Sequence, residues 1–127
     1  MIKFGIVGCG RIAKRHSELL GNNVIKGAQL VAVCDVKKDR ANGIAKDFNV
    51  NSYDDMDKMM TSEDIDVVVV LTPSGMHAHH TINLAKYGKD IMVEKPMALT
   101  LDDADAMIKE CDKNNCRLFV IKQNRNN

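Results

Sequence analysis

The stretch MIKFGIVGCGRIA, residues 1–13, predicts a strand, a tight glycine turn and the start of a helix. The residues before the glycine turn are mostly apolar and end at Val7, as in a buried strand. The pattern Gly-x-Gly-x-x-Ala follows at residues 8–13, and apolar residues then recur at helical spacing. This order is typical of the first strand-helix-strand unit of a dinucleotide-binding domain.

Each position of the turn has a physical role beside a bound dinucleotide. Gly8 permits the tight turn out of the strand, Gly10 leaves no Cβ where a pyrophosphate approaches, and Ala13 lets the helix pack closely. The amides of Arg11 and Ile12 would bind phosphate oxygens, helped by the positive end of the helix dipole. The alternative is a glycine turn in another kind of parallel α/β protein.

Asp35 strengthens the first interpretation because it ends the next apolar run, LVAVC at residues 30–34. A carboxylate roughly 20 residues past the glycine motif can accept hydrogen bonds from the adenosine ribose. Lys37, Lys38 and Arg40 follow it, and cations in this place could hold the 2′-phosphate of NADP. Because the charge of Asp35 would repel that phosphate, the sequence favours NAD and leaves NADP open.

Strand-like and helix-like stretches alternate along the rest of the chain. Strands are predicted at residues 2–7, 29–34, 50–52, 65–71, 90–93 and 117–121. A helix is predicted from Met76 to Tyr87, with Gly88 as its left-handed cap. The alternation predicts an α/β fold over residues 1–121: a Rossmann-type, doubly wound parallel sheet of about six strands in the order 3-2-1-4-5-6.

Composition excludes several classes of function. The 127 residues fit one domain, and 18 Lys and Arg against 17 Asp and Glu give no electrostatic case for binding nucleic acid or a membrane. The sequence shows no signal segment and no apolar run long enough for a membrane span, which favours a cytoplasmic protein. The four cysteines form no Cys-x-x-Cys pair, so we expect free thiols rather than a metal site or disulfide.

Lys95 is the candidate for chemistry. Pro73 and Pro96 each follow a predicted strand, at the sheet edge that also carries the glycine turn, and ligands bind at this edge in open α/β sheets. Lys95, between Glu94 and Pro96, could exchange a proton with a substrate hydroxyl or hold that hydroxyl in line for hydride transfer. The alternative is a solvated surface ammonium.

Three histidines at the start of the helix after Pro73 raise the question of a metal site. His77 and His80 share a helix face, whereas His79 points elsewhere, and no carboxylate or cysteine joins them at a ligand spacing. We therefore predict no metal site. We expect His77 to face the crevice and the other two histidines to be solvated.

These segments together resemble the amino-terminal half of the Gfo/Idh/MocA oxidoreductase family. The matching motifs are GCGRIA at residues 8–13, TPSGMH at residues 72–77 and GKDIMVEKP at residues 88–96. The resemblance implies a dinucleotide fold in which Lys95 is catalytic and Glu94 lies at the ribose of the nicotinamide half.

The resemblance also implies roles for residues outside the glycine turn. Thr72, Pro73 and His77 would lie near the nicotinamide half of the cofactor. The closing segment, with Gln123 and Arg125, resembles the hinge of members that oxidise nucleotide-linked amino-sugar uronates, such as UDP-sugar uronate 3-dehydrogenases. These two residues would flank the cofactor or substrate.

Members of this family continue into a second α/β domain that supplies substrate contacts and the oligomer interface. We therefore expect residues 122–127 to begin a hinge, and this fragment to bind NAD(H) with little or no turnover. The full-length protein is expected to be a homo-oligomeric NAD(P)-dependent dehydrogenase of a sugar or cyclitol hydroxyl, including a sugar carried on a nucleotide. The alternative is a non-catalytic nucleotide sensor or regulatory module.

Overall fold

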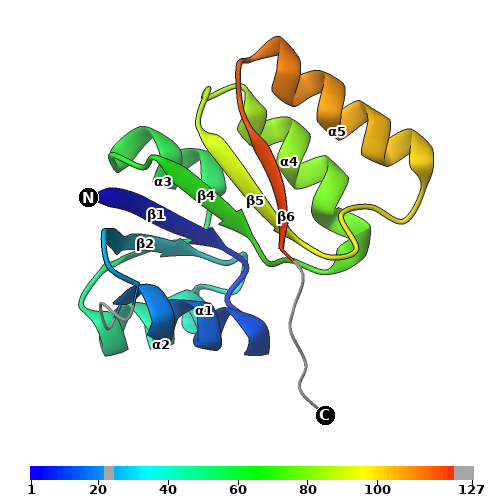
Figure 1. Ribbon diagram of the computed structural model, residues 1–127. Coiled ribbons are helices and arrows are strands. Elements are labelled where there is room, and N and C mark those ends of the chain that lie inside the picture. The colour runs from blue at the N-terminus through cyan, green and yellow to red at the C-terminus, as the bar shows by residue number, and fades with distance from the viewer. Residues whose placement is uncertain (22–24, 122–127) are drawn as a thin grey trace.

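The computed structural model describes residues 1–21 and 25–121, which form one six-stranded sheet in the order β3-β2-β1-β4-β5-β6 (Figure 1). Every strand pair is parallel. The predicted Rossmann-type topology is confirmed. The elements are β1 (Ile2–Val7), α1 (Arg11–Gly21), β2 (Ala28–Cys34), α2 (Lys38–Phe48), β3 (Asn51–Tyr53), α3 (Met56–Ser62), β4 (Val67–Val70), the short 3₁₀ helix η1 (Ser74–Met76), α4 (His77–Ala85), β5 (Asp90–Glu94), α5 (Leu101–Lys113) and β6 (Leu118–Ile121).

Most predicted boundaries differ from the structure by one or two residues, and two of these differences change the local structure. The strand expected at residues 65–71 is shorter, because Ile65 packs into the core ahead of β4 instead of pairing as part of it. The helix expected from Met76 is preceded by the separate turn η1, which begins after Pro73. The cap at Gly88 agrees with the prediction, since its φ is +69°.

Helices cover both faces of the sheet, and strand alternation divides the core accordingly (Figure 1). Val68 and Val70 of β4 pack with α3, α4 and α5, whereas Val69 between them packs on the side of α1 and α2. Each of the three valines is at most 2% exposed, as expected for a parallel strand covered on both sides. None of the described helices is long and apolar enough to cross a membrane.

Parallel pairing brings the carboxyl ends of the strands to one edge. The strand order reverses between β1 and β4, which is where ligands bind in such sheets. At this point the two loops touch, because a Cβ built on Gly8 would lie 2.8 Å from the backbone of Leu71 and of Thr72. Gly8 also has a φ of +99°, which a residue with a side chain rarely adopts.

The core on the side of α4 and α5 generates a stability prediction. Ile91 of β5 is fully buried, so replacing it with Ala leaves a cavity. We expect Ile91→Ala to lower the free energy of unfolding by about 2–5 kcal/mol, measured by urea denaturation. Ile108→Ala is the matched control because Ile108 is 45% exposed, and its cost should stay below about 1 kcal/mol. Equal losses would contradict this packing.

Candidate functional site

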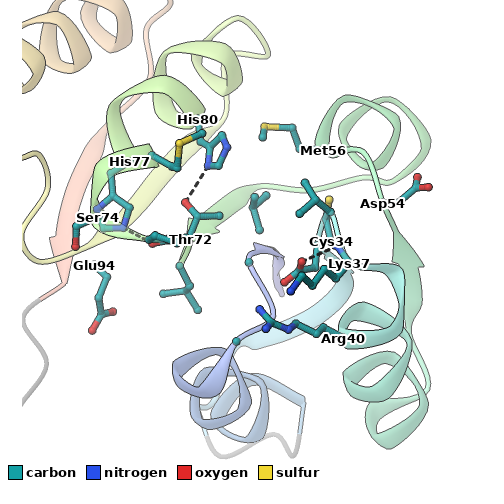
Figure 2. A pocket seen from close by; sticks show the side chains of 18 of the residues that line it. Cys34, Lys37, Arg40, Asp54, Met56, Thr72, Ser74, His77, His80 and Glu94 are labelled. Carbon is teal, nitrogen blue, oxygen red and sulfur yellow. Dashed lines mark hydrogen bonds between the residues drawn. The ribbon is translucent and has the colours of Figure 1, made fainter.

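A pocket of about 640 Å³ opens at the carboxyl edge of the sheet (Figure 2). It is built from the loops after β1, β2, β4 and β5, together with the starts of α3 and α4. These segments are distant in the sequence. The residues predicted from sequence that line the pocket are Gly8, Gly10, Asp35, Thr72, Pro73, His77, Glu94 and Lys95.

The glycine turn leaves open space where the sequence predicts a pyrophosphate. A Cβ built on Gly10 meets no atom within 4 Å, although Gly10 lines the pocket. Helix α1 begins at Arg11, so the amides of Arg11 and Ile12 belong to its amino end. The side chains of these two residues are outside the description. Ala13 is 1% exposed, as expected for close packing between helix and sheet.

Asp35 connects two loops through its carboxylate. Its Oδ2 accepts a hydrogen bond from the Cys9 amide at 2.8 Å, and its Oδ1 accepts one from the Lys37 amide at 2.8 Å. The residue is only 8% exposed, yet it lines the pocket. Each carboxylate oxygen can accept a further hydrogen bond. Asp35 can therefore hold the glycine turn in place and still bind two neighbouring hydroxyls.

The three basic residues that follow Asp35 in the sequence do not all face the pocket. Lys37 and Arg40 line the pocket beside Asp35. Lys38 does not line it, and its ammonium donates instead to the carbonyl oxygen of Ser52 at 3.4 Å. Two positive charges and one negative charge therefore face the same end of the pocket.

His77 joins the loop after β4 to the loop after β5. Its ring is 2% exposed, with Nδ1 2.9 Å from the Pro96 carbonyl oxygen and Nε2 2.7 Å from the Thr72 carbonyl oxygen. It reaches the pocket, but both ring nitrogens are engaged with backbone. The histidine thus fixes the position of the segment that follows Lys95.

The expectation that His80 is solvated is wrong. Its Nδ1 lies 2.8 Å from Oγ1 of Thr72, and the half-buried ring lines the pocket (Figure 2). The cause is the helical spacing that places His77 and His80 on one face of α4, while His79 is exposed. Among the described residues, no group of three or more His, Cys, Asp or Glu side chains could hold a metal ion.

Sequence reasoning also missed Asp54 and Met56, which line the pocket opposite Thr72. Met56 packs against the core on the side of α3 and also faces the pocket (Figure 2). Their position in the sequence could have identified them, because both residues follow β3 at the sheet edge where ligands bind. Gln123 and Arg125 lie outside the described residues.

Lys95 and Glu94 complete the pocket at the end of β5. Lys95 is exposed, and its amide donates to the Ile121 carbonyl oxygen at 2.9 Å. The bond from Lys95 to Pro96 is cis. Glu94 is 6% exposed, and neither of its carboxylate oxygens has a hydrogen-bond partner in the described chain. Its oxygens therefore have the capacity to accept hydrogen bonds from a ligand.

The fold and the pocket define a dinucleotide-binding domain of the Rossmann class. The residues present fit a nicotinamide dinucleotide: open space at Gly10 for a pyrophosphate, the Asp35 carboxylate for one ribose, and a buried carboxylate at Glu94 in need of donors. The chain belongs to the Gfo/Idh/MocA oxidoreductase family, because the family described as "Oxidoreductase family, NAD-binding Rossmann fold" matches residues 2–122. The resemblance inferred from sequence and the NAD class of cofactor are confirmed.

Known proteins with similar sequences or structures include enzymes of sugar and cyclitol metabolism. The WlbA dehydrogenase of Bordetella pertussis, solved in complex with NADH and UDP-GlcNAcA, is 36% identical with a TM-score of 0.91 and matches 99% of this chain and 38% of its own. The myo-inositol 2-dehydrogenase of Thermotoga maritima is 34% identical over 94% of this chain and 35% of its own.

A third relative performs a different net reaction. The 2,7-anhydro-N-acetylneuraminate hydratase of Mediterraneibacter gnavus is 30% identical over 88% of this chain and 29% of its own. The chain therefore spans about a third of the length of these relatives. The part they share with it is the cofactor half.

Gly10 generates a prediction that separates binding from folding. Gly10→Ala adds a Cβ to empty space, so we expect the unfolding free energy to change by less than about 0.5 kcal/mol. The same Cβ occupies the room of the pyrophosphate, and NADH affinity measured by calorimetry should fall roughly tenfold or more. Gly43→Ala is the matched control, because Gly43 is equally open but lies on α2 away from the pocket. Undiminished NADH binding by Gly10→Ala would contradict the assignment.

His80 generates a prediction about pH. Burial, followed by the charges of His79 and His77, lowers the pKa of His80 below its ordinary value of 6.5. The unfolded chain therefore takes up this proton more readily, and stability is lost as pH falls below 6.5 through the pKa of the folded state. His80→Asn should reduce the fall in unfolding free energy below pH 6.5, measured by urea denaturation at a series of pH values. The unmodified chain is the reference, and an unchanged pH slope in His80→Asn would contradict the prediction.

Proposed function

We propose that this chain is the cofactor domain of a dehydrogenase that moves a hydride between a nicotinamide and a carbon bearing a hydroxyl in a sugar or cyclitol. The observation that carries the proposal is that Lys95 and the glycine turn line one pocket. Residues 1–121 would form this domain, and residues 122–127 would begin the hinge to a substrate domain. The length of the relatives supports this division.

Different residues of the chain would bind different parts of the dinucleotide. The amides of Arg11 and Ile12 would hold the pyrophosphate, and Gly10 would give it room. Asp35 would accept hydrogen bonds from the adenosine ribose. A 2′-phosphate would meet the Asp35 charge, which favours NAD over NADP, while Lys37 offers partial compensation.

The opposite end of the pocket would hold the reacting ring. Thr72 and Pro73 line it, His77 fixes the loop that follows Lys95, and Glu94 would accept from the second ribose. When bound, the nicotinamide accepts or returns the hydride. Lys95 would take the hydroxyl proton during oxidation and give it back during reduction, so that a proton and a hydride leave the same alcohol group.

The relatives support the proposed substrate class. The similarity to a dehydrogenase solved with UDP-GlcNAcA supports a nucleotide-linked sugar uronate, and the similarity to an inositol dehydrogenase supports a cyclitol. The hydratase relative indicates that this domain by itself does not decide the net reaction. Contacts from the remaining two thirds of such a protein would select the substrate.

Lys95 provides the test of this function. In the full-length protein, Lys95→Ala should lower turnover roughly a hundredfold to ten-thousandfold, because the proton transfer loses its side chain. NADH affinity, measured by calorimetry on this chain, should change by less than about twofold, since the cofactor is held by other residues. Lys109→Ala on the exposed side of α5 is the matched control.

Two outcomes would overturn the proposal. Full turnover by Lys95→Ala would favour a nucleotide sensor or regulatory module, in which this lysine is dispensable. Absence of NADH binding by the unmodified chain would exclude the dinucleotide site itself.

A further inference from the structure

The Glu94 carboxyl group is unusual because it is buried and has no hydrogen-bond donor in the described chain. Strand alternation directs it to the α1 side of the sheet, since Met92 two residues earlier packs there and Val93 packs on the opposite side. Figure 2 shows the Glu94 side chain pointing away from His77. Helices α1 and α2 cover this side of the sheet.

His16 is the residue of α1 that lies beside this carboxyl group. Its Nε2 lies 3.4 Å from Oε2 of Glu94, which is within ion-pair distance but longer than a usual hydrogen bond. The histidine occupies the buried face of α1 with Ala13, Ser17 and Leu20, at spacings of three and four residues. Its side chain is 21% exposed, against 8% for Glu94.

We propose that His16 is a positioning residue, which holds the Glu94 carboxylate in place to accept hydrogen bonds from the second ribose of the dinucleotide. This inference rests on the proposed function. His16 approaches Oε2, and Glu94 lines the pocket, where a ribose hydroxyl can donate to the carboxyl group. The sugar hydroxyls then supply the donors that the described chain lacks.

The pair also connects the two ends of the site. Helix α1 carries the amides expected to bind the pyrophosphate, and β5 leads directly into Lys95. An interaction between His16 and Glu94 therefore sets the distance between the phosphate-binding turn and the proton-transfer residue. Ser17, the other polar residue on this face, bonds within its own helix, because its Oγ donates to the Ala13 carbonyl oxygen at 2.7 Å.

A series of three ligands tests the role of His16 on this chain. ADP reaches the adenosine and pyrophosphate sites, ADP-ribose adds the second ribose, and NADH adds the nicotinamide. We expect His16→Leu to weaken ADP-ribose and NADH binding by the same factor, roughly tenfold, with ADP affinity unchanged within about twofold. Calorimetry measures all three affinities, and His79→Leu on the exposed side of α4 is the matched control.

The conservative variants keep the test decisive if His16→Leu does not fold. Gln places a nitrogen donor near the position of Nε2, so His16→Gln should retain ADP-ribose affinity within about threefold, whereas the shorter His16→Asn should lose it. Equal weakening of ADP would show that His16 only supports the glycine turn, and unchanged ADP-ribose binding in His16→Leu or His16→Asn would show that it does not act on Glu94. If the unmodified chain bound none of the three ligands, the proposed function would fail and this inference with it.

Discussion

The contact between the first loop and the end of β4 is the constraint on which the site depends. Gly8 has a φ of +99°, and any side chain there would collide with the backbone of Leu71 and Thr72 at 2.8 Å. Because this approach is possible, the glycine turn and the Thr72 loop share one pocket instead of forming two separate edges. The strand order reverses at the same point, so the neighbouring helices leave on opposite faces and the space between them stays open.

Three polar side chains hold the loops around this opening. Asp35 binds the amides of Cys9 and Lys37, His77 connects two backbone carbonyls, and His16 of α1 contacts Glu94 at the end of β5. Asp35 and His77 each fix a loop that follows another element. Such supports keep a binding site in its productive geometry before the ligand arrives, which lowers the cost of ordering it.

The relationship to the family explains why this domain is informative about cofactor and less so about substrate. The relatives include a dehydrogenase solved with UDP-GlcNAcA and two enzymes named for an inositol and an anhydro sugar, and all match most of this chain with about a third of their own length. The shared part carries the glycine turn, Asp35 and Lys95. These proteins therefore have similar cofactor halves but are named for different reactions and compounds, as is usual when function resides in sites added to a fold.

The sequence by itself determined the strand order, the glycine turn and the placement of Lys95 at the ligand-binding edge. These features follow from local patterns. Apolar periodicity and glycine spacing can be read directly from the sequence, and the alternation of strands and helices predicts the parallel topology. Tertiary structure decided that His80 bonds Thr72, that Met56 faces the pocket, and that His16 meets Glu94. These contacts depend on the angle at which a helix crosses the sheet and on which side chain lies opposite, and neither quantity is encoded in the spacing of residues within one element.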